Sequence, residues 1–505
     1  MQTPYIKKIL SARVYDVAIE TPLEPALNLS RRKSNNILLK REDLQRVFSF
    51  KLRGAYNCIY QLSQKKKVKG VIAASAGNHA QGVALAAKRL GINATIVMPK
   101  TTPNIKVEAV KSYGASVVLK GDTYDEACTH AEALAEQRKL DFIHPYDDPQ
   151  VIAGQGTVGL EIMRQHADPV DVIFVPVGGG GLIAGMSMYC KYIRPETKII
   201  GIEPEDAACM ALAFDKKKRV ALSHVGIFAD GVAVRKVGRE TFRIARKYVD
   251  EIMTVNTDEI CAAIKDVFDD TRSIMEPAGA LAAAGIKKYI DRENIEGETL
   301  VAVCSGANMN FDRLRHVAER AEIGEHREAL LAVTIPEKPG SFRAFCKIIG
   351  RRGITEFNYR YLDDTDAQVF TGIQLKNAEI EKQEIIDKLR AKKYQVLDMS
   401  DNEVAKMHVR HLVGGHAVMR DEVLFRFEFP ERPGALLDFL TSIGNKWNIS
   451  LFHYRNHGAA FGRVLVGLQT PETERKALLK HLDTLAYSYW DETDNPAYQL
   501  FLASP

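Results

Sequence analysis

The stretch DVIFVPVGGGGLIAGMSMYCKYI (residues 171–193) contains the pattern that decides the fold. It begins with an apolar run as long as a buried strand, passes through four glycines, and continues as a segment of helical length. A strand that leads through a glycine turn into a helix is the building unit of a parallel α/β sheet. Such sheets bind ligands at the carboxyl ends of their strands, which is where this turn lies.

The same unit recurs on both sides of this stretch. Apolar runs within GVIAASAG (residues 70–77), NATIVMP (93–99) and TLVAVC (299–304) are each followed by a turn and a helical segment. Strands that alternate with helices favour parallel pairing. We predict an α/β region with parallel sheets over residues 1–320, in which roughly 45–150 form a smaller subdomain.

Beyond this region the chain repeats itself. PEKPGSF (residues 336–342) recurs as PERPGAL (430–436), and VFTGIQL (369–375) recurs as VLVGLQT (464–470), with a drift of one residue between the two pairs. Each copy is predicted to run strand, Pro-Gly turn, helix, strand, strand, helix, strand, which is the order of a ferredoxin-like α+β domain. The predicted boundaries are a linker at 321–328, one domain at 329–400 and a second at 422–498.

Composition argues against several classes of protein. The net charge of +5 is small for 505 residues, and the basic residues form no stripe interleaved with aromatics, so we expect no nucleic-acid partner. There is no apolar run of about 18 residues and no signal-like N-terminus, so we expect no membrane span. The seven cysteines form no Cys-x-x-Cys pair, which suits a reducing compartment and predicts a cytoplasmic location.

The string SFKLRG (residues 49–54) contains the first candidate for chemistry. If Ser49 caps a helix, Lys51 lies in the first turn, where the helix field and burial lower the pKa of its amine. A neutral amine is what a Schiff-base lysine needs. A surface lysine is the alternative, and the six-residue string favours the functional interpretation.

The string SAGNHAQG (residues 75–82) follows a predicted strand, where backbone N–H groups can hold a carboxylate. Asn78 is either a ligand of a bound molecule or an ordinary helix cap. His79 is interpreted as structural rather than catalytic.

The glycine turn, Gly178-Gly179-Gly180-Gly181-Leu182, suits a phosphate because its amides are unhindered and a helix follows. A dinucleotide site is the rival, since Gly179, Gly181 and Ala184 fit the relaxed fingerprint and Glu203 lies near the distance of a ribose ligand. No Gly-Lys-Ser/Thr follows, so a P-loop is excluded.

Two further strings are candidates for the same site. In CSGAN (residues 304–308), Ser305 either bonds a ring nitrogen or caps a helix. EPAGA (residues 276–280) is predicted to begin a helix close to the site.

Taken together and in this order, SFKLRGAY, SAGNHAQG, GGGGL and CSGAN resemble the threonine and serine dehydratase branch of the fold-type II pyridoxal-phosphate enzymes. The C-terminal pair resembles the duplicated ACT-like domains of biosynthetic threonine dehydratases. The implied fold is a tryptophan synthase β-like catalytic region followed by two ACT-like domains. Dinucleotide enzymes do not require the lysine and serine strings. The resemblance therefore favours a phosphate site over a dinucleotide site at the glycine turn.

The resemblance implies roles for individual residues. Lys51 would bind pyridoxal 5'-phosphate covalently and then act as the base at the substrate α-carbon, Asn78 would bond the ring hydroxyl, and Ser305 would face the ring nitrogen. Gly178, Gly179, Gly180, Gly181 and Leu182 would hold the phosphate. The pocket for the substrate carboxylate would be lined by Ser75, Gly77, Asn78 and His79.

The resemblance also implies an activity and partners. The expected reaction converts L-threonine to 2-oxobutanoate and ammonia, a step towards isoleucine, with L-serine as a secondary substrate. Isoleucine is expected to inhibit and valine to activate through the ACT-like domains of a homo-tetramer. The alternatives are a serine-preferring dehydratase and a non-catalytic amino-acid sensor.

Two positions depart from the related serine racemases. Their divalent-cation site uses a glutamate and, six residues later, an aspartate; Glu203 matches the first, but Cys209 occupies the second, so we predict no metal. Their second catalytic base is a serine, and Ala76 stands at that position.

Overall fold

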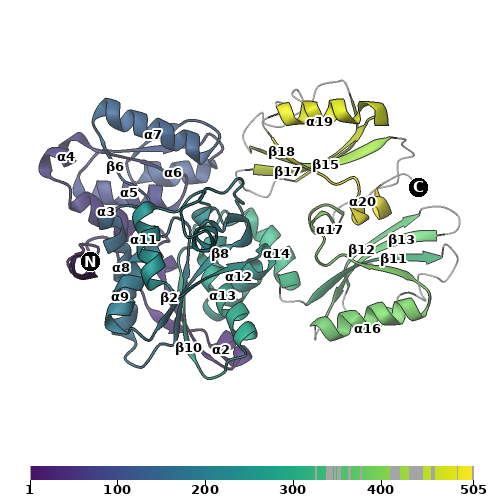
Figure 1. Cartoon of the computed structure of the whole chain (residues 1–505), viewed down its shortest axis with the longest axis horizontal. Coiled ribbons are helices and arrows are strands. Elements are labelled where there is room, and N and C mark those ends of the chain that lie inside the picture. The colour runs from purple at the N-terminus through teal and green to yellow at the C-terminus, as the bar shows by residue number, and fades with distance from the viewer. Residues whose placement is uncertain are drawn as a thin grey trace. The chain divides into compact units, whose positions relative to one another are not determined.

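The computed structural model divides into two units that each pack within themselves, Met1–Ala321 and Glu322–Pro505 (Figure 1). The structure describes residues 2–324, 327–336, 345, 348–349, 354–361, 366–375, 378–409, 421–430, 447–455, 461–485 and 487–502.

The larger sheet of the first unit has six strands. All pair in parallel except the short edge strand. Their order is β1 (Leu23–Pro25), β2 (Asn36–Arg41), β10 (Thr299–Cys304), β7 (Val172–Pro176), β8 (Lys198–Pro204), β9 (Glu251–Val255).

Both faces of this sheet are covered, because side chains alternate between the faces of a strand. Val172 and Phe174 pack with α12 (Thr257–Thr271) and α13 (Pro277–Glu293). Ile173 and Val175 pack on the opposite face, against four helices. These are α8 (Pro149–Gln165), α9 (Gly181–Ile193), α10 (Cys209–Asp215) and α11 (Arg239–Tyr248). A strand buried on both faces must be apolar throughout, which explains the continuous run in the opening stretch.

The smaller sheet is also parallel. Its order is β5 (Ser116–Leu119), β4 (Ala94–Met98), β3 (Val71–Ala74), β6 (Asp141–Phe142). One face packs against α3 (Lys51–Tyr60), α5 (Asn78–Leu90) and α6 (Asn104–Ser112), and the other against α7 (Tyr124–Arg138). The remaining elements of this unit are α1 (Gln2–Leu10), α2 (Leu27–Lys33), η1 (Glu42–Leu44), α4 (Gln64–Lys69), η2 (Glu205–Ala207), η3 (Asp230–Val232) and α14 (Arg313–Gly324), the last of which extends into the second unit.

The second unit consists of two four-stranded antiparallel sheets of identical topology, and both have the ferredoxin-like strand order that the sequence predicts. The first is β12 (Ile354–Tyr361), β13 (Asp366–Gln374), β11 (Glu328–Pro336), β14 (Gln395–Asp398). The second is β16 (Asn448–Arg455), β17 (Phe461–Gln469), β15 (Glu422–Pro430), β18 (Ser488–Asp491). The Pro-Gly turns and most of the helices predicted after them lie outside the described residues.

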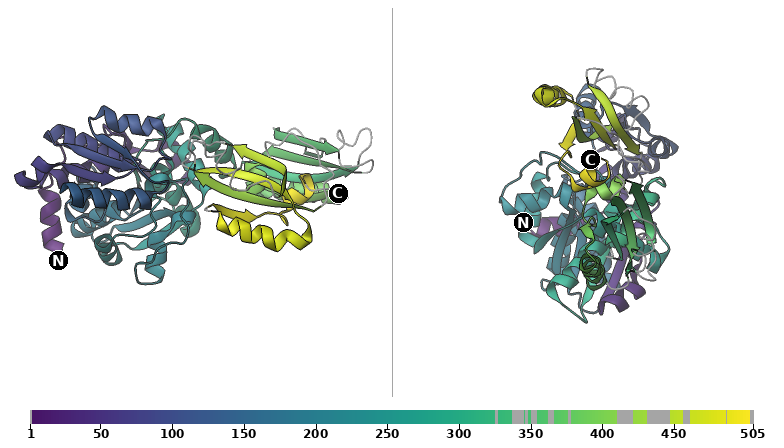
Figure 2. Two further views of the ribbon diagram at one scale, coloured as in Figure 1. Left: turned by 90° about the horizontal axis from the view of Figure 1, so that it is seen from above. Right: turned by 90° about the vertical axis from the view of Figure 1, so that its right-hand side faces the viewer.

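Each copy has its own helix on one face of its sheet (Figures 1 and 2). Helix α16 (Ala378–Ala391) buries Ile385 and Leu389 against the first sheet, and α19 (Arg475–Thr484) buries Leu478 and Leu482 against the second. The short helices α17 (Glu403–Met407) and α20 (Pro496–Phe501) follow the last strand of each copy, and η5 (Glu472–Glu474) precedes α19.

The two copies also share one apolar core. Leu330, Phe370 and Val404 of the first copy belong to the same buried cluster as Leu424 and Tyr498 of the second. The duplicated domains therefore form a pair rather than two independent modules. Along the described residues, no helix has both the length and the apolar character that crossing a membrane requires.

Candidate active site

Lys51 is the first residue of α3, as the sequence predicts, but Ser49 does not cap the helix. Phe50 stands at the cap position with helical backbone angles and no capping hydrogen bond. Ser49 lies one residue too far back, because its backbone pairs with Gly306 in a β-bridge. The hydroxyl of Ser49 is buried without a hydrogen-bond partner.

The amine of Lys51 lies in a desolvated environment. Burial lowers its pKa to about 8, and the charge of Glu276 opposes that shift. A lysine with this pKa has a much larger neutral fraction near neutral pH than an ordinary lysine, which suits both covalent bond formation and proton removal.

Asn78 begins α5, and Gly77 occupies the cap position. The helix-cap interpretation of Asn78 is therefore wrong. Its amide instead lies between two side chains: Nδ2 donates to Glu276 Oε1 over 2.5 Å, and Oδ1 accepts from Asn308 Nδ2 over 2.6 Å. Asn308 also donates to the carbonyl oxygen of Val47. Asn308 ends the CSGAN string, and nothing in that string indicates that it bonds Asn78.

The other residues of the SAGNHAQG string have different surroundings. Gly77 donates its backbone N–H to Ser75 Oγ over 3.2 Å, and a Cβ at Gly77 would meet no atom within 4 Å. The space beside Gly77, just before α5, is therefore open. His79 is buried, its Nε2 lies 2.8 Å from the carbonyl oxygen of Ile143, and burial lowers its pKa to about 3. An imidazole that is neutral near neutral pH and bonded to the backbone fits the structural role expected for His79.

The glycine turn connects β7 to α9, and packing explains its composition. Gly180 has a φ of 92°, a conformation that side chains disfavour. A Cβ at Gly178 would press on the backbone of Val232, and one at Gly179 would overlap the ring of Tyr146. Gly180 caps α9 without any side-chain hydrogen bond, so the helix start has no capping group of its own. Leu182 is buried in the core behind the turn.

Sequence reasoning overlooked the segment HPYDDP (residues 144–149), which lies against this turn. His144 Nδ1 accepts the backbone N–H groups of Tyr146 and Asp147. The carboxylate of Asp147 accepts backbone N–H groups at the start of α11, from which Thr241 Oγ1 donates to the carbonyl oxygen of Gly179 over 2.7 Å. The available signal was a polar and aromatic stretch directly after a strand, as in the other site strings.

Ser305 lies at the carboxyl end of β10 and does not cap a helix, since α14 begins only at Arg313. Its hydroxyl donates to the carbonyl oxygen of Ala278 over 3.2 Å, and its own carbonyl accepts from the N–H of Phe50 over 3.3 Å. The segments containing Lys51 and Ser305 are therefore hydrogen-bonded neighbours.

Glu276 directly precedes α13, which confirms the predicted helix start at EPAGA. A Cβ at Gly306 would overlap its carboxylate, so Glu276 lies against both the Asn78 and the Ser305 segments. Burial, followed by the nearby charge of Asp230, raises the pKa of Glu276 to about 7.

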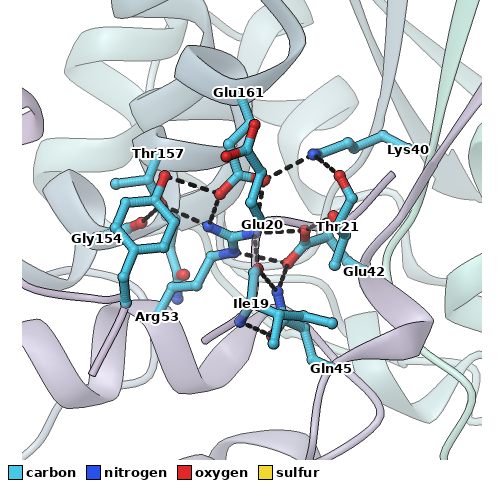
Figure 3. Close-up of polar contacts among 12 residues, drawn as sticks. Ile19, Glu20, Thr21, Lys40, Glu42, Gln45, Arg53, Gly154, Thr157 and Glu161 are labelled. Atoms are coloured by element: carbon cyan, nitrogen blue, oxygen red, sulfur yellow. Dashed lines mark hydrogen bonds and ion pairs between the residues drawn. The ribbon is translucent and has the colours of Figure 1, made fainter. Parts of the chain in front are cut away.

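A buried network of ion pairs joins α3 to neighbouring elements of the fold (Figure 3). Arg53 donates two hydrogen bonds to Glu42, both of 2.7 Å, and two to Glu161, of 2.5 and 2.9 Å. Lys40 donates to Glu161 over 2.6 Å, and all four side chains are fully buried. Because Arg53 follows Lys51 by two residues, the network ties the lysine's helix to β2, η1 and α8. Arg53 lies in the SFKLRG string, but the sequence does not indicate that Glu42 and Glu161 are its partners.

Glu203 and Cys209 lie close together at the end of β8, with 3.7 Å between Oε1 and Sγ. The carboxylate of Glu203 accepts the N–H groups of Met210 and Ala211, each over 2.8 Å, and burial raises its pKa to about 8. Across the part of the chain that the structure describes, no group of three His, Cys, Asp or Glu side chains has the arrangement of a metal site.

The residues brought together fit pyridoxal phosphate. The start of α9 carries no side-chain cap, as a helix start that binds a phosphate requires. Lys51 is a half-buried lysine with a lowered pKa. Its segment and the α5 segment also contain two buried polar atoms without a hydrogen-bond partner, Ser49 Oγ and His79 Nδ1.

Comparison with known proteins agrees with this geometry. Residues 14–306 match the family model described as pyridoxal-phosphate dependent enzyme, and residues 319–409 and 413–502 each match the C-terminal regulatory domain of threonine dehydratase. The chain is 55% identical over 503 residues to the biosynthetic L-threonine dehydratase of Burkholderia multivorans, covering 99% of each protein. It is 51% identical to the Escherichia coli biosynthetic enzyme, covering 99% of this chain and 97% of that one.

Among solved structures, the processed form of threonine deaminase isoform 2 from Solanum lycopersicum is 55% identical, with a TM-score of 0.62. It covers 63% of this chain and 93% of its own. The chain therefore belongs to the pyridoxal-phosphate-dependent threonine dehydratases, in the branch with C-terminal regulatory domains.

Proposed function

We propose that this chain converts L-threonine to 2-oxobutanoate and ammonia, with L-serine as a secondary substrate. The observation that supports the proposal is that hydrogen bonds join the segments of Lys51, Asn78 and Ser305. The glycine turn packs against Val232, and the preceding Gly231 lies beside the Asn78 amide. The names of the full-length relatives support threonine as the substrate.

Pyridoxal phosphate, when bound, supplies an electron sink for the negative charge that develops at the substrate α-carbon. Lys51 would hold the cofactor and, once released by the substrate amine, remove the α-hydrogen as a general base. Its lowered pKa favours this role, because the amine must be neutral to accept a proton.

The remaining site residues would hold and orient the reactants. Asn78 would donate to the ring oxygen, and the residues from Gly178 to Leu182 would bind the phosphate. The open space beside Gly77, at the start of α5, would take the substrate carboxylate. Ser75 and His79 would complete that pocket. Ser305 would offer the ring nitrogen a neutral hydroxyl, which, unlike a carboxylate, would not enforce protonation of that nitrogen.

We further propose that the duplicated domains bind isoleucine as an inhibitor and valine as an activator, and that the chain acts as a cytoplasmic homo-tetramer. The supporting observation is that the two copies form one paired unit with a shared core. The proposed division is a catalytic region at 1–320, a linker at 321–328 and regulatory domains at 329–400 and 422–498. Inhibition requires that isoleucine bind one conformational state better than another.

The direct test measures release of ammonia and 2-oxo acid from threonine and from serine, each with and without isoleucine and valine. We expect the higher kcat/KM with threonine, inhibition by isoleucine and relief by valine. A chain ending at Arg320 should keep the activity and ignore isoleucine. A higher kcat/KM with serine, or isoleucine inhibition of the shortened chain, would refute the corresponding part of the proposal.

A further inference from the structure

Glu276 is the buried acid of the site that the scheme above leaves without a role. It stands at the cap position of α13, where a carboxylate commonly bonds the free N–H groups of its own helix. Glu276 makes no such cap and instead accepts the Asn78 amide. Its carboxylate is therefore directed at the site rather than at its own helix.

The Asn78 amide can be accounted for atom by atom. Its oxygen accepts from Asn308, and one of its two N–H groups donates to Glu276. Within the described residues the second N–H group has no hydrogen-bond partner. With both ends of the amide held, it cannot flip, and a single donor remains for a bound molecule.

The charges that face Glu276 come from four elements. Lys51 lies on α3, and Asp230 on η3 is paired with Lys106 of α6 over 2.7 Å and with Arg313 of α14 over 3.2 Å. Burial and Asp230 raise the pKa of Glu276, whereas Lys106 and Arg313 lower it. Gly306 lies between the Glu276 carboxylate and Ser49, which precedes Lys51 by two residues. The charge of Glu276 therefore raises the pKa of Lys51, against the larger lowering caused by burial.

We propose that Glu276 is a positioning residue with two tasks at the cofactor. It holds the Asn78 amide so that one N–H remains for the cofactor's ring oxygen, and it supplies the negative charge that sets the protonation of the Lys51 nitrogen. The inference rests on the proposed function, since both tasks concern a cofactor attached to Lys51.

Two variants of the full-length holoenzyme separate the tasks. Glu276→Gln removes the charge but keeps an oxygen that accepts from Asn78, whereas Glu276→Asp keeps the charge but withdraws the carboxylate by one methylene group. The first readout is the pH titration of the visible absorbance band of the lysine-bound cofactor. The second is the Kd of the cofactor, measured by equilibrium dialysis.

For Glu276→Gln we expect the titration midpoint to fall by about one pH unit, because loss of a nearby negative charge destabilises the protonated nitrogen. Its cofactor Kd should stay within about threefold of the wild type. For Glu276→Asp we expect the midpoint to stay near the wild type and the Kd to rise about tenfold, which corresponds to loss of a charged hydrogen bond. Glu203→Gln, which removes another buried carboxylate, serves as the matched control and should not move the midpoint.

A wild-type midpoint in Glu276→Gln would overturn the electrostatic task, and a wild-type Kd in Glu276→Asp would overturn the positioning task. If the wild-type chain develops no visible band with pyridoxal phosphate, the proposed function itself fails and this inference fails with it. An equal shift in Glu203→Gln would show that any buried charge acts on Lys51, which also overturns the assignment to Glu276.

Discussion

Asn402 and Asn495, at equivalent positions of the two duplicated domains, are bonded to each other, with 3.2 Å between Nδ2 of the first and Oδ1 of the second. Each also caps its own short helix: Asn402 Oδ1 accepts from the N–H of Ala405, and Asn495 Oδ1 accepts from that of Ala497. One pair of side chains thus begins both helices and joins the two copies.

Two further hydrogen bonds occupy equivalent positions in the two copies. Ser400 Oγ accepts the N–H of Leu330, and Thr493 Oγ1 accepts the N–H of Leu424, each over 3.1 Å. The duplication read from the sequence therefore extends to individual side-chain contacts.

Replacing Asn402 or Asn495 by alanine should destabilise the second unit by about 1 kcal/mol each, since a helix cap is lost. The double variant should cost less than the sum, because the bond between them is lost only once. Urea denaturation followed by tryptophan fluorescence measures this directly, as both tryptophans, Trp447 and Trp490, lie in the second copy. Strict additivity would show that the Asn402–Asn495 bond contributes nothing.

Lys51→Ala should lower kcat for threonine by at least about 10³-fold, because both the covalent anchor and the base are lost. The purified variant should also lack the visible absorbance band that pyridoxal phosphate gives when bound to lysine. Lys66→Ala, which removes an exposed lysine paired with Asp141, is the control and should retain both properties. Turnover near the wild-type rate in Lys51→Ala would disprove the assignment.

Gly179→Ala should weaken cofactor binding by about tenfold or more, because the added methyl group overlaps the Tyr146 ring and must displace it or the turn. Equilibrium dialysis of the apoenzyme with pyridoxal phosphate gives the Kd. Adding Tyr146→Ala makes room for the methyl group, so the double variant should recover part of the lost affinity. If the double variant is no better than Gly179→Ala, the clash with Tyr146 is not the reason for this glycine.

Arg53→Met should destabilise the first unit by about 3–5 kcal/mol, because two buried carboxylates, Glu42 and Glu161, lose their partner. Arg164→Met is the matched control, since its pair with Glu20 is partly exposed and should be worth at most about 1 kcal/mol. Thermal denaturation followed by circular dichroism compares the two. If both variants lost the same free energy of unfolding, burial would not make the Arg53 ion pairs more stabilising than an exposed pair.

Much of the site was predictable because its signals are local. A strand, a glycine turn and a helix follow one another in residues 171–193, and the structure places them as β7, the turn and α9. The first-turn position of Lys51 was likewise predictable. The capping role of Ser49 was wrong, because the β-bridge between Ser49 and Gly306 joins segments that are far apart in the chain.

The sequence by itself determined the order of strands and helices, the duplication and the candidate residues, because periodicity and turn chemistry act over a few neighbouring residues. Only the tertiary structure decided which candidates meet. The bond from Asn78 to Glu276 and the approach of Tyr146 to Gly179 join residues far apart along the chain. Such contacts arise from how sheets and helices pack, and burial within that packing sets the pKa of Lys51 and Glu276.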